Sequence, residues 1–143
     1  MIIRSMEKKD VPEVSIIEKE NFKNPWSEKA FLDTFLNKNI IYLVACDKER
    51  IIGMCGVHHI LGEGEITNVA VKNSYKRQHV GEQMMTALME KGRIMGIDEF
   101  TLEVRVGNKA AISLYEKLGF VTEGIRKNFY ENPIEDALIM WKR

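Results

Sequence analysis

The chain has 143 residues, of which 45% are hydrophobic and 29% charged, the size and composition of one ordinary globular domain. Its 21 basic and 21 acidic side chains give a formal net charge of zero, so no overall field would attract nucleic acid. No apolar run approaches the roughly 18 residues of a membrane span, and the N-terminus lacks a signal-peptide layout. We therefore expect a single cytoplasmic domain over residues 1–143, without a nucleic-acid or membrane partner.

The cysteine and histidine residues argue against a metal site. Cys46 and Cys55 lie in separate strand-like segments and have neither metal-ligand nor redox spacing. His58 and His59 are adjacent, so on a strand they would point to opposite faces. We expect two reduced cysteines and no metal. Because the chain has no coiled-coil heptad and no obvious apolar stripe for association, we also expect a monomer.

The N-terminal quarter predicts one strand followed by two helices. Residues 2–5 are strand-like, and Asp10 offers an N-cap to a first helix with Pro12 in its first turn. The segment Asn-Pro-Trp-Ser at residues 24–27 ends that helix, and Ser27 can cap the next one. The apolar positions of the second helix follow i, i+1, i+4, i+5 spacing and are Phe31, Leu32, Phe35 and Leu36.

The remainder alternates between β-rich runs and amphipathic helices. Strands are predicted at residues 40–46, 51–58, 65–71, 100–105, 120–125 and 134–141. A long helix starts near His79 and stops at Gly96, and a short one spans about 108–118. The resulting order, βααβββαβαββ, predicts an α/β fold with a central mixed sheet and helices on both of its faces.

The turn at residues 73–81, which leads from a strand into a helix, is a candidate anion site. A helix N-terminus presents unpaired N–H groups and a positive dipole. Lys76 and Arg77 add positive charge there, and Gly81 removes one side chain from the approach. This chemistry suits a phosphate or pyrophosphate, but an ordinary basic surface loop has the same composition. Local sequence does not choose between the two.

A second candidate site consists of three polar residues in and after the strand predicted at residues 100–105. Glu103 lies on the polar face of the strand at 100–105, where simple solvation is the alternative. Tyr115 lies on the apolar stripe of its helix, as a core tyrosine would. Asn108 is in the position of a helix cap. Asn108 and Tyr115 are two helical turns apart, so they share a face at roughly 10 Å separation.

A longer pattern covers these residues and reads LEVR-x-x-N-x-x-A-x-x-LY-x-x-LGF over 102–120. It is accompanied by NVAV at 68–71, YKR at 75–77, NPWS at 24–27, and R-x-x-FY at 126–130 followed by EDA at 135–137. On these motifs the chain resembles the GNAT acetyltransferases, and among them the ribosomal-protein-alanine N-acetyltransferases, over residues 1–140. The resemblance implies a sheet that splays open in the middle, with acetyl-CoA entering the gap.

The resemblance also implies a set of cofactor contacts. Val69 and Val71 match the strand whose backbone bonds the pantetheine arm, and the N–H near Val71 would polarise the thioester carbonyl. The loop at 77–82 would cradle the pyrophosphate, and Asn108 would contact the cofactor from the other side. The residues implied are Val69, Ala70, Val71, Lys76, Arg77, Gln78, His79, Val80, Gly81, Glu82 and Asn108.

The chemistry of transfer gives roles to the other two residues. A free α-amine has a pKa of about 8, so near neutral pH much of it is protonated and not nucleophilic. Glu103, directly or through a water, can accept that proton as the general base. Tyr115 matches the family position of the acid that protonates the leaving thiolate. Direct transfer forms no acyl-enzyme, so neither cysteine is needed as a nucleophile.

The acceptor side is assigned by resemblance as well. Trp26 and Ser27 match the entry to the second helix, which lines the acceptor groove, and Tyr130 and Glu135 match its far wall. For Trp26, packing in the core is an equal alternative, and Glu135 could instead lie on a solvated strand edge. The implied partner is the N-terminus of an acceptor peptide, and an N-terminal Ala of a small-subunit ribosomal protein is the leading candidate.

Two positions depart from the family pattern. His79 stands where the pyrophosphate loop has its first glycine, which allows close backbone approach and positive φ. Histidine adds bulk there, although it tolerates positive φ better than most residues and could donate to a phosphate oxygen. Phe129 stands where close relatives place a tyrosine. Two alternatives therefore stay open: an enzyme acting on a small amine or a lysine side chain, and a module that binds acyl-CoA or a partner without turnover. Glu103 and Tyr115 favour an enzyme.

Overall fold

A computed structural model describes residues 1–143, and it contains every predicted helix and strand in the predicted order. The elements are β1 (Ile2–Ser5), α1 (Val11–Asn21), α2 (Glu28–Asp33), β2 (Ile40–Asp47), β3 (Arg50–Ile60), β4 (Glu63–Val71), α3 (Val80–Ile94), β5 (Glu99–Arg105), α4 (Lys109–Lys117), β6 (Val121–Tyr130) and β7 (Glu135–Lys142). Short 3-10 turns lie at Lys8–Asp10, Thr34–Leu36 and Asn73–Tyr75. No helix is both long enough and apolar enough to cross a membrane.

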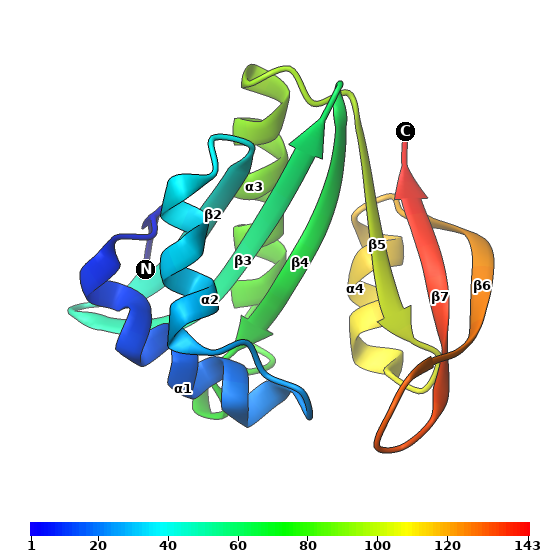
Figure 1. Ribbon diagram of the computed structural model, residues 1–143, viewed down its shortest axis with the longest axis horizontal. Helices are drawn as coiled ribbons and strands as arrows, with labels where there is room; N and C mark the ends of the chain where they lie inside the picture. The colour runs from blue at the N-terminus through cyan, green and yellow to red at the C-terminus, as the bar shows by residue number, and fades with distance from the viewer.

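The strands form one seven-stranded sheet in the order β1-β2-β3-β4-β5-β7-β6. All neighbouring pairs are antiparallel except β4 and β5, which are parallel. These two strands pair only at Glu63↔Glu99, Gly64↔Phe100 and Glu65↔Thr101. Beyond Glu65 they diverge, and Figure 1 shows the two halves of the sheet spreading apart below this junction. The predicted mixed, splayed sheet is confirmed.

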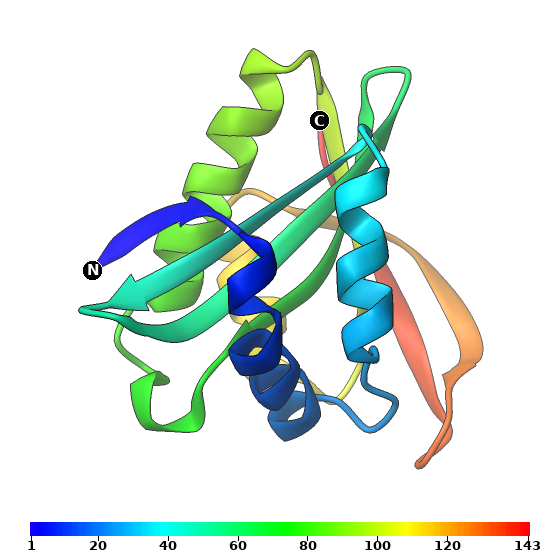
Figure 2. The same cartoon turned by 60° about the vertical axis from the view of Figure 1, so that its left-hand side comes forward.

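Helices cover both faces of the sheet, as predicted. Figures 1 and 2 show α1 and α2 on one face and α3 with α4 on the other. Under α3 the buried side chains include Met84, Leu88 and Phe100. Under α1 and α2 they include Val14 and Phe31. The sheet is therefore enclosed by two apolar cores, one on each face.

The start of α1 differs from the prediction. Asp10 does not cap the helix, because a 3-10 turn at Lys8–Asp10 precedes it and Asp10 already has helical backbone angles. The Asp10 carboxylate instead accepts the Glu7 N–H at 2.8 Å and pairs with both terminal nitrogens of Arg4, at 2.7 and 2.9 Å. Pro12 lies in the first turn as predicted, and Ser27 caps α2 by accepting the Ala30 N–H at 3.1 Å.

The second helix is shorter than its apolar spacing suggested. It ends at Asp33 and continues as the 3-10 turn Thr34–Leu36, whose tighter winding rotates later side chains off the α-helical stripe. Phe31 is fully buried, but Leu32 is 42% exposed and Leu36 is 84% exposed. The predicted four-residue apolar face is therefore wrong for these two leucines.

Candidate active site

The edge of β4 that leaves β5 exposes backbone groups to the space between the strands. The Lys72 N–H donates to Ile52 O on β3 at 2.8 Å. Because successive residues of a strand alternate in direction, the Val71 N–H turns away from β3 toward the side where β5 no longer pairs. The Val69 and Val71 side chains pack against the core under α3, whereas Ala70 is buried beneath α1. The predicted role of the Val71 N–H remains a prediction, and the backbone geometry leaves this group available for it.

The loop between β4 and α3 contains two residues in the left-handed conformation. Arg77 and His79 both have φ of 64°. His79 occupies the N-cap position of α3 without a side-chain capping bond. His79 thus adopts the positive φ that glycine permits at this position, and histidine carries the strain that glycine would avoid. Lys76 and Gln78 are exposed beside it.

Gly81 packs closely against α4. A Cβ at this position would lie only 3.2 Å from Leu114 Cδ2 of α4. Val80, the preceding residue, is buried, so only its backbone faces the loop. The first turn of α3 therefore lies tightly between β4 and α4, with its N–H groups at the open end of the splay.

Glu82 forms a small charge cluster at the mouth of a surface cavity. Its Oε2 lies 3.2 Å from His79 Nδ1 and 3.0 Å from Lys117 Nζ. Lys117 and then His79 lower the pKa of this carboxyl. The cavity has a volume of about 510 Å³ and is lined by α3 side chains and Lys117. The Glu82 carboxylate thus connects His79, in the loop predicted to bind pyrophosphate, to Lys117 of α4.

Glu103 lies on the polar face of β5, with its side chain 22% exposed. Arg126 Nε on β6 is 2.7 Å from Glu103 Oε2, but the N–H is poorly aligned, so this buried oxygen has no hydrogen-bond donor. Burial raises the pKa of Glu103, Arg126 opposes the rise, and Glu65 adds to it. A carboxylate with a raised pKa and an unused lone pair can accept a proton near neutral pH.

Tyr115 lies on the opposite side of the sheet from Glu103. It is 7% exposed, belongs to the core under α3, and its ring centroid is 6.0 Å from that of Phe120. Burial raises its pKa, with smaller increases from Tyr130 and Cys55. The phenol therefore stays protonated across the neutral range and can act as a proton donor. A group held between β4 and β5 would lie between this phenol and Glu103.

Asn108 is the N-cap of α4, because its Oδ1 accepts the Ala111 N–H at 3.2 Å. Asn108 therefore has the structural role of a helix cap, which its position in the sequence had indicated. Capping uses only the carbonyl oxygen, so the exposed amide nitrogen remains able to donate to a ligand. The cofactor contact stays a prediction.

Arg105 contacts both residues predicted to form the far wall of the acceptor groove, Tyr130 and Glu135. Its guanidinium lies 4.4 Å from the centre of the Tyr130 ring, and its Nη1 is 3.2 Å from Glu135 Oε1. Glu135 also accepts the Gly107 N–H at 2.7 Å. Glu135 therefore supports the loop that precedes α4 and is not on a solvated edge. Burial and the charge of Glu103 raise the pKa of Tyr130 to about 12.

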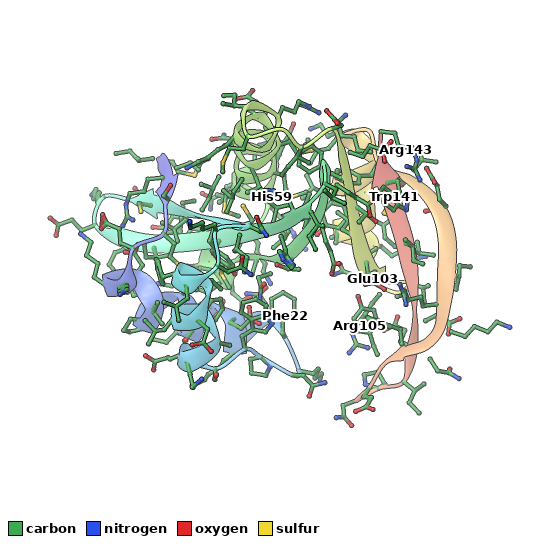
Figure 3. All side chains as sticks on the ribbon, turned by 45° about the horizontal axis from the view of Figure 1, so that its top comes forward. Phe22, His59, Glu103, Arg105, Trp141 and Arg143 are labelled. Carbon is green, nitrogen blue, oxygen red and sulfur yellow. The ribbon has the colours of Figure 1, made fainter.

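The other residues predicted to line the acceptor groove, Trp26 and Ser27, lie in the loop that follows α1. Figure 3 shows Glu103 and Arg105 on the side of the sheet where Phe22 follows α1. Trp26 is half-buried, and its ring centroid is 5.2 Å from that of Phe31. The Ser27 hydroxyl is occupied by capping. Both residues thus have structural roles, and their contact with an acceptor stays a prediction.

Sequence reasoning did not assign roles to three charged residues near the site. Arg126 contacts Glu103, and Glu65 raises the pKa of Glu103. Glu18 is buried and accepts the N–H of Trp26 in the loop that follows α1. The sequence placed Arg126 only within the motif at 126–130, because its contact with Glu103 reaches from β6 across β7 to β5. Glu18 could not be singled out from the sequence, because it is one of several charged residues in α1. The chain holds no group of three or more potential metal ligands, and both cysteines are buried and unpaired.

Comparison with known proteins places this geometry among related chains. Residues 11–120 match the family described as acetyltransferase (GNAT) family. The ribosomal protein bS18-alanine N-acetyltransferase of Escherichia coli (strain K12) is 34% identical over 140 residues, which cover 96% of this chain and 94% of that protein. A Bacillus subtilis (strain 168) protein, to which the same activity is provisionally ascribed, is 35% identical over 97% of this chain and 93% of its own. The crystal structure of the ribosomal-protein-S18-alanine N-acetyltransferase from Escherichia coli has a TM-score of 0.89 and 33% identity, covering 98% of this chain and 91% of that chain.

Proposed function

The chain belongs to the GNAT acetyltransferase family and is an acyltransferase, and from this premise we propose that it acetylates the N-terminal α-amine of a protein, with ribosomal protein bS18 as the acceptor. The observation that carries the proposal is the separation of β4 and β5 beyond Glu65, with Glu103 on one side and Tyr115 on the other. The named relatives, which align over almost the whole chain, support the choice of acceptor. A ribosomal acceptor would place the protein in the cytoplasm.

Acetyl-CoA is the proposed co-substrate, and the residues present fit it. The Val71 N–H points away from β3 and can donate to an acyl carbonyl. The left-handed residues Arg77 and His79 turn the chain into α3, whose first N–H groups can bind phosphate. The thioester supplies the acetyl group. Lys76, Gln78, Val80, Gly81 and Glu82 complete the proposed loop, and the Asn108 amide approaches from α4.

The proposed proton path uses two residues of this chain. Glu103 accepts the proton of the α-ammonium group, directly or through water, and its buried Oε2 without an aligned donor supports this role. The amine then attacks the thioester carbonyl, its nitrogen loses a second proton to water, and the C–S bond breaks. Tyr115 donates its phenolic proton to the sulfur that leaves. Each group ends with its charge changed by one proton, and exchange with solvent restores both.

The proposal is tested by measuring thiol release from acetyl-CoA. A peptide with the bS18 N-terminal sequence starting at Ala should be acetylated, whereas the same peptide with a blocked N-terminus should give no release. Polyamines, aminoglycosides and an internal lysine peptide form the second arm. Thiol release only with the compounds of the second arm would show that the acceptor is a small amine or a lysine side chain. Acetyl-CoA binding without thiol release in either arm would indicate a binding module.

A further inference from the structure

Glu18 is a buried carboxylate that the proposed chemistry does not use. It lies in the last half of α1 and is 2% exposed. Burial raises its pKa, while hydrogen bonds from the Trp26 N–H and the Asn68 amide oppose the rise. A charged or polar side chain is costly to bury unless it is hydrogen-bonded, so its contacts are a guide to its purpose.

The contacts of Glu18 join three segments that are distant in the sequence. Glu18 Oε2 accepts the Trp26 N–H at 3.0 Å, in the loop formed by residues 22–27. Both carboxylate oxygens accept from Asn68 Nδ2 at 3.2 Å. Asn68 has a φ of 56°, so it forms a local irregularity in β4. One carboxylate thereby connects α1, loop 22–27 and the strand that leads into Val69–Val71.

A second bond fastens the same helix to the same strand. Asn21 Nδ2, one turn after Glu18, donates to Val71 O at 3.2 Å. The end of α1 is therefore attached to β4 at both ends of the segment proposed to contact acetyl-CoA. Loop 22–27 contains Trp26, which is predicted to contact the acceptor. The Trp26 N–H donates to Glu18 and so joins the backbone of this loop to the same part of α1.

We infer that Glu18 is a positioning residue that holds loop 22–27 at a fixed distance from Val69–Val71, so that the acceptor amine meets the thioester. The inference rests on the proposed function. A positioned acceptor and a positioned thioester must be set relative to each other, because a displacement of about 1 Å can cost two orders of magnitude in rate. Glu18 accepts hydrogen bonds from both segments, from Trp26 in the loop and from Asn68 beside Val69.

Two variants and one control test the inference. Glu18→Met keeps the side-chain length but removes both bonds. Asn68→Gly removes only the strand side of the connection, and glycine accepts the positive φ. Glu18→Gln is the conservative control: its carbonyl can still accept from Trp26, and its NH₂ can donate to Asn68 Oδ1, which is buried without a partner. Michaelis constants for the Ala peptide and for acetyl-CoA are measured separately for each.

We expect Glu18→Met to raise the peptide KM about tenfold or more, because loop 22–27 would no longer be held in place to bind the peptide, and Asn68→Gly to raise it by a smaller factor. The acetyl-CoA KM should stay within about twofold of wild type, and Glu18→Gln should restore the peptide KM. Equal increases in both Michaelis constants, or an unchanged peptide KM, would overturn the inference.

Hydrogen exchange gives a readout that does not need turnover. In Asn68→Gly the bond from Trp26 to Glu18 is not itself altered, so faster exchange of the Trp26 amide would report that Asn68 holds the loop through Glu18. Unchanged exchange in this variant would contradict the inference, and this measurement decides if Glu18→Met does not fold. Wild-type protein that binds acetyl-CoA but does not acetylate the peptide would refute the proposed function separately, while the exchange result would stand.

Discussion

At the level of single residues, the pairing of Glu103 with Arg126 has a measurable effect on proton transfer. Arg126 lowers a pKa that burial raises, so removal of its charge should raise the pKa of Glu103 further. Glu103 must be deprotonated to accept a proton, and activity therefore rises with pH through its pKa. We expect Arg126→Gln to move the acidic limb of the kcat/KM profile to higher pH.

Arg126→Lys is the matched control for this shift. It keeps the positive charge and should leave the limb near its wild-type position, although it loses the planar guanidinium. The profile is measured by thiol release at saturating acetyl-CoA. A limb that moved to lower pH in Arg126→Gln, or moved equally in both variants, would show that the charge of Arg126 does not act on the base.

Tyr115 is a second residue whose contribution can be isolated. Phenylalanine preserves the buried ring that packs near Phe120, so Tyr115→Phe should leave the fold intact. Loss of a general acid should lower kcat by about 10²-fold or more. Acetyl-CoA affinity, measured by titration calorimetry, should change little because the ring is retained. An unchanged kcat would remove Tyr115 from the proposed proton path.

At the level of elements, the start of α3 contains strain at His79. Replacement by glycine or by alanine removes the same imidazole and the same contact with Glu82. Only alanine retains a Cβ at φ 64°, which costs about 1 kcal/mol or more. We expect His79→Gly to exceed His79→Ala in free energy of unfolding by about this amount, measured by urea denaturation. Equal stability would mean that the loop relaxes to another conformation.

The start of α4 tests whether Asn108 has one role or two. Asn108→Ala removes the cap and should cost about 1 kcal/mol, whereas Asn108→Ser keeps a capping oxygen and should cost less. Both variants lack the amide nitrogen. If Asn108 also contacts acetyl-CoA, affinity should fall in both variants to a similar extent. If acetyl-CoA affinity instead falls in proportion to the loss of stability in each variant, Asn108 acts only as a helix cap.

The order and type of the elements could be predicted from the sequence, because each has a clear apolar period and a recognisable end. Gly96 and the Ser27 cap are examples where local chemistry decides the boundary. The prediction failed where two local choices compete. Asp10 could cap α1 or bind Arg4, and the 3-10 turn decided for Arg4. Leu36 followed the α-helical period, but the helix tightened before reaching it.

The candidate site divides in the same way. Glu103 and Tyr115 were predicted because they belong to a long, specific motif. Arg126 and Glu18 were not assigned, because their partners lie two strands away and on another segment. Side-chain pairs that cross the sheet depend on the spatial order of the strands, which the pattern within one strand does not give. Single-residue roles, the single-domain organisation and the monomeric state stay predictions.

At the level of the whole molecule, the open edge of β4 should respond to cofactor binding. Its amides at 69–71 lie beyond the last pair with β5, and those that turn away from β3 lack a neighbouring strand. We expect acetyl-CoA to slow hydrogen exchange at these amides and at the first turn of α3. Strand β2, paired on both sides, is the internal control. Protection at α3 alone would place the cofactor without its proposed contact to β4.

The short junction between β4 and β5 also has a consequence for donor length. Past the three paired positions the strands separate, whereas at the junction they approach the usual spacing of about 4.8 Å. In the proposed orientation, a phosphate at the α3 end directs the acyl group toward this junction. Each methylene added to an acetyl group would therefore move into a narrowing space. The narrowing sheet would therefore favour short acyl groups over long ones.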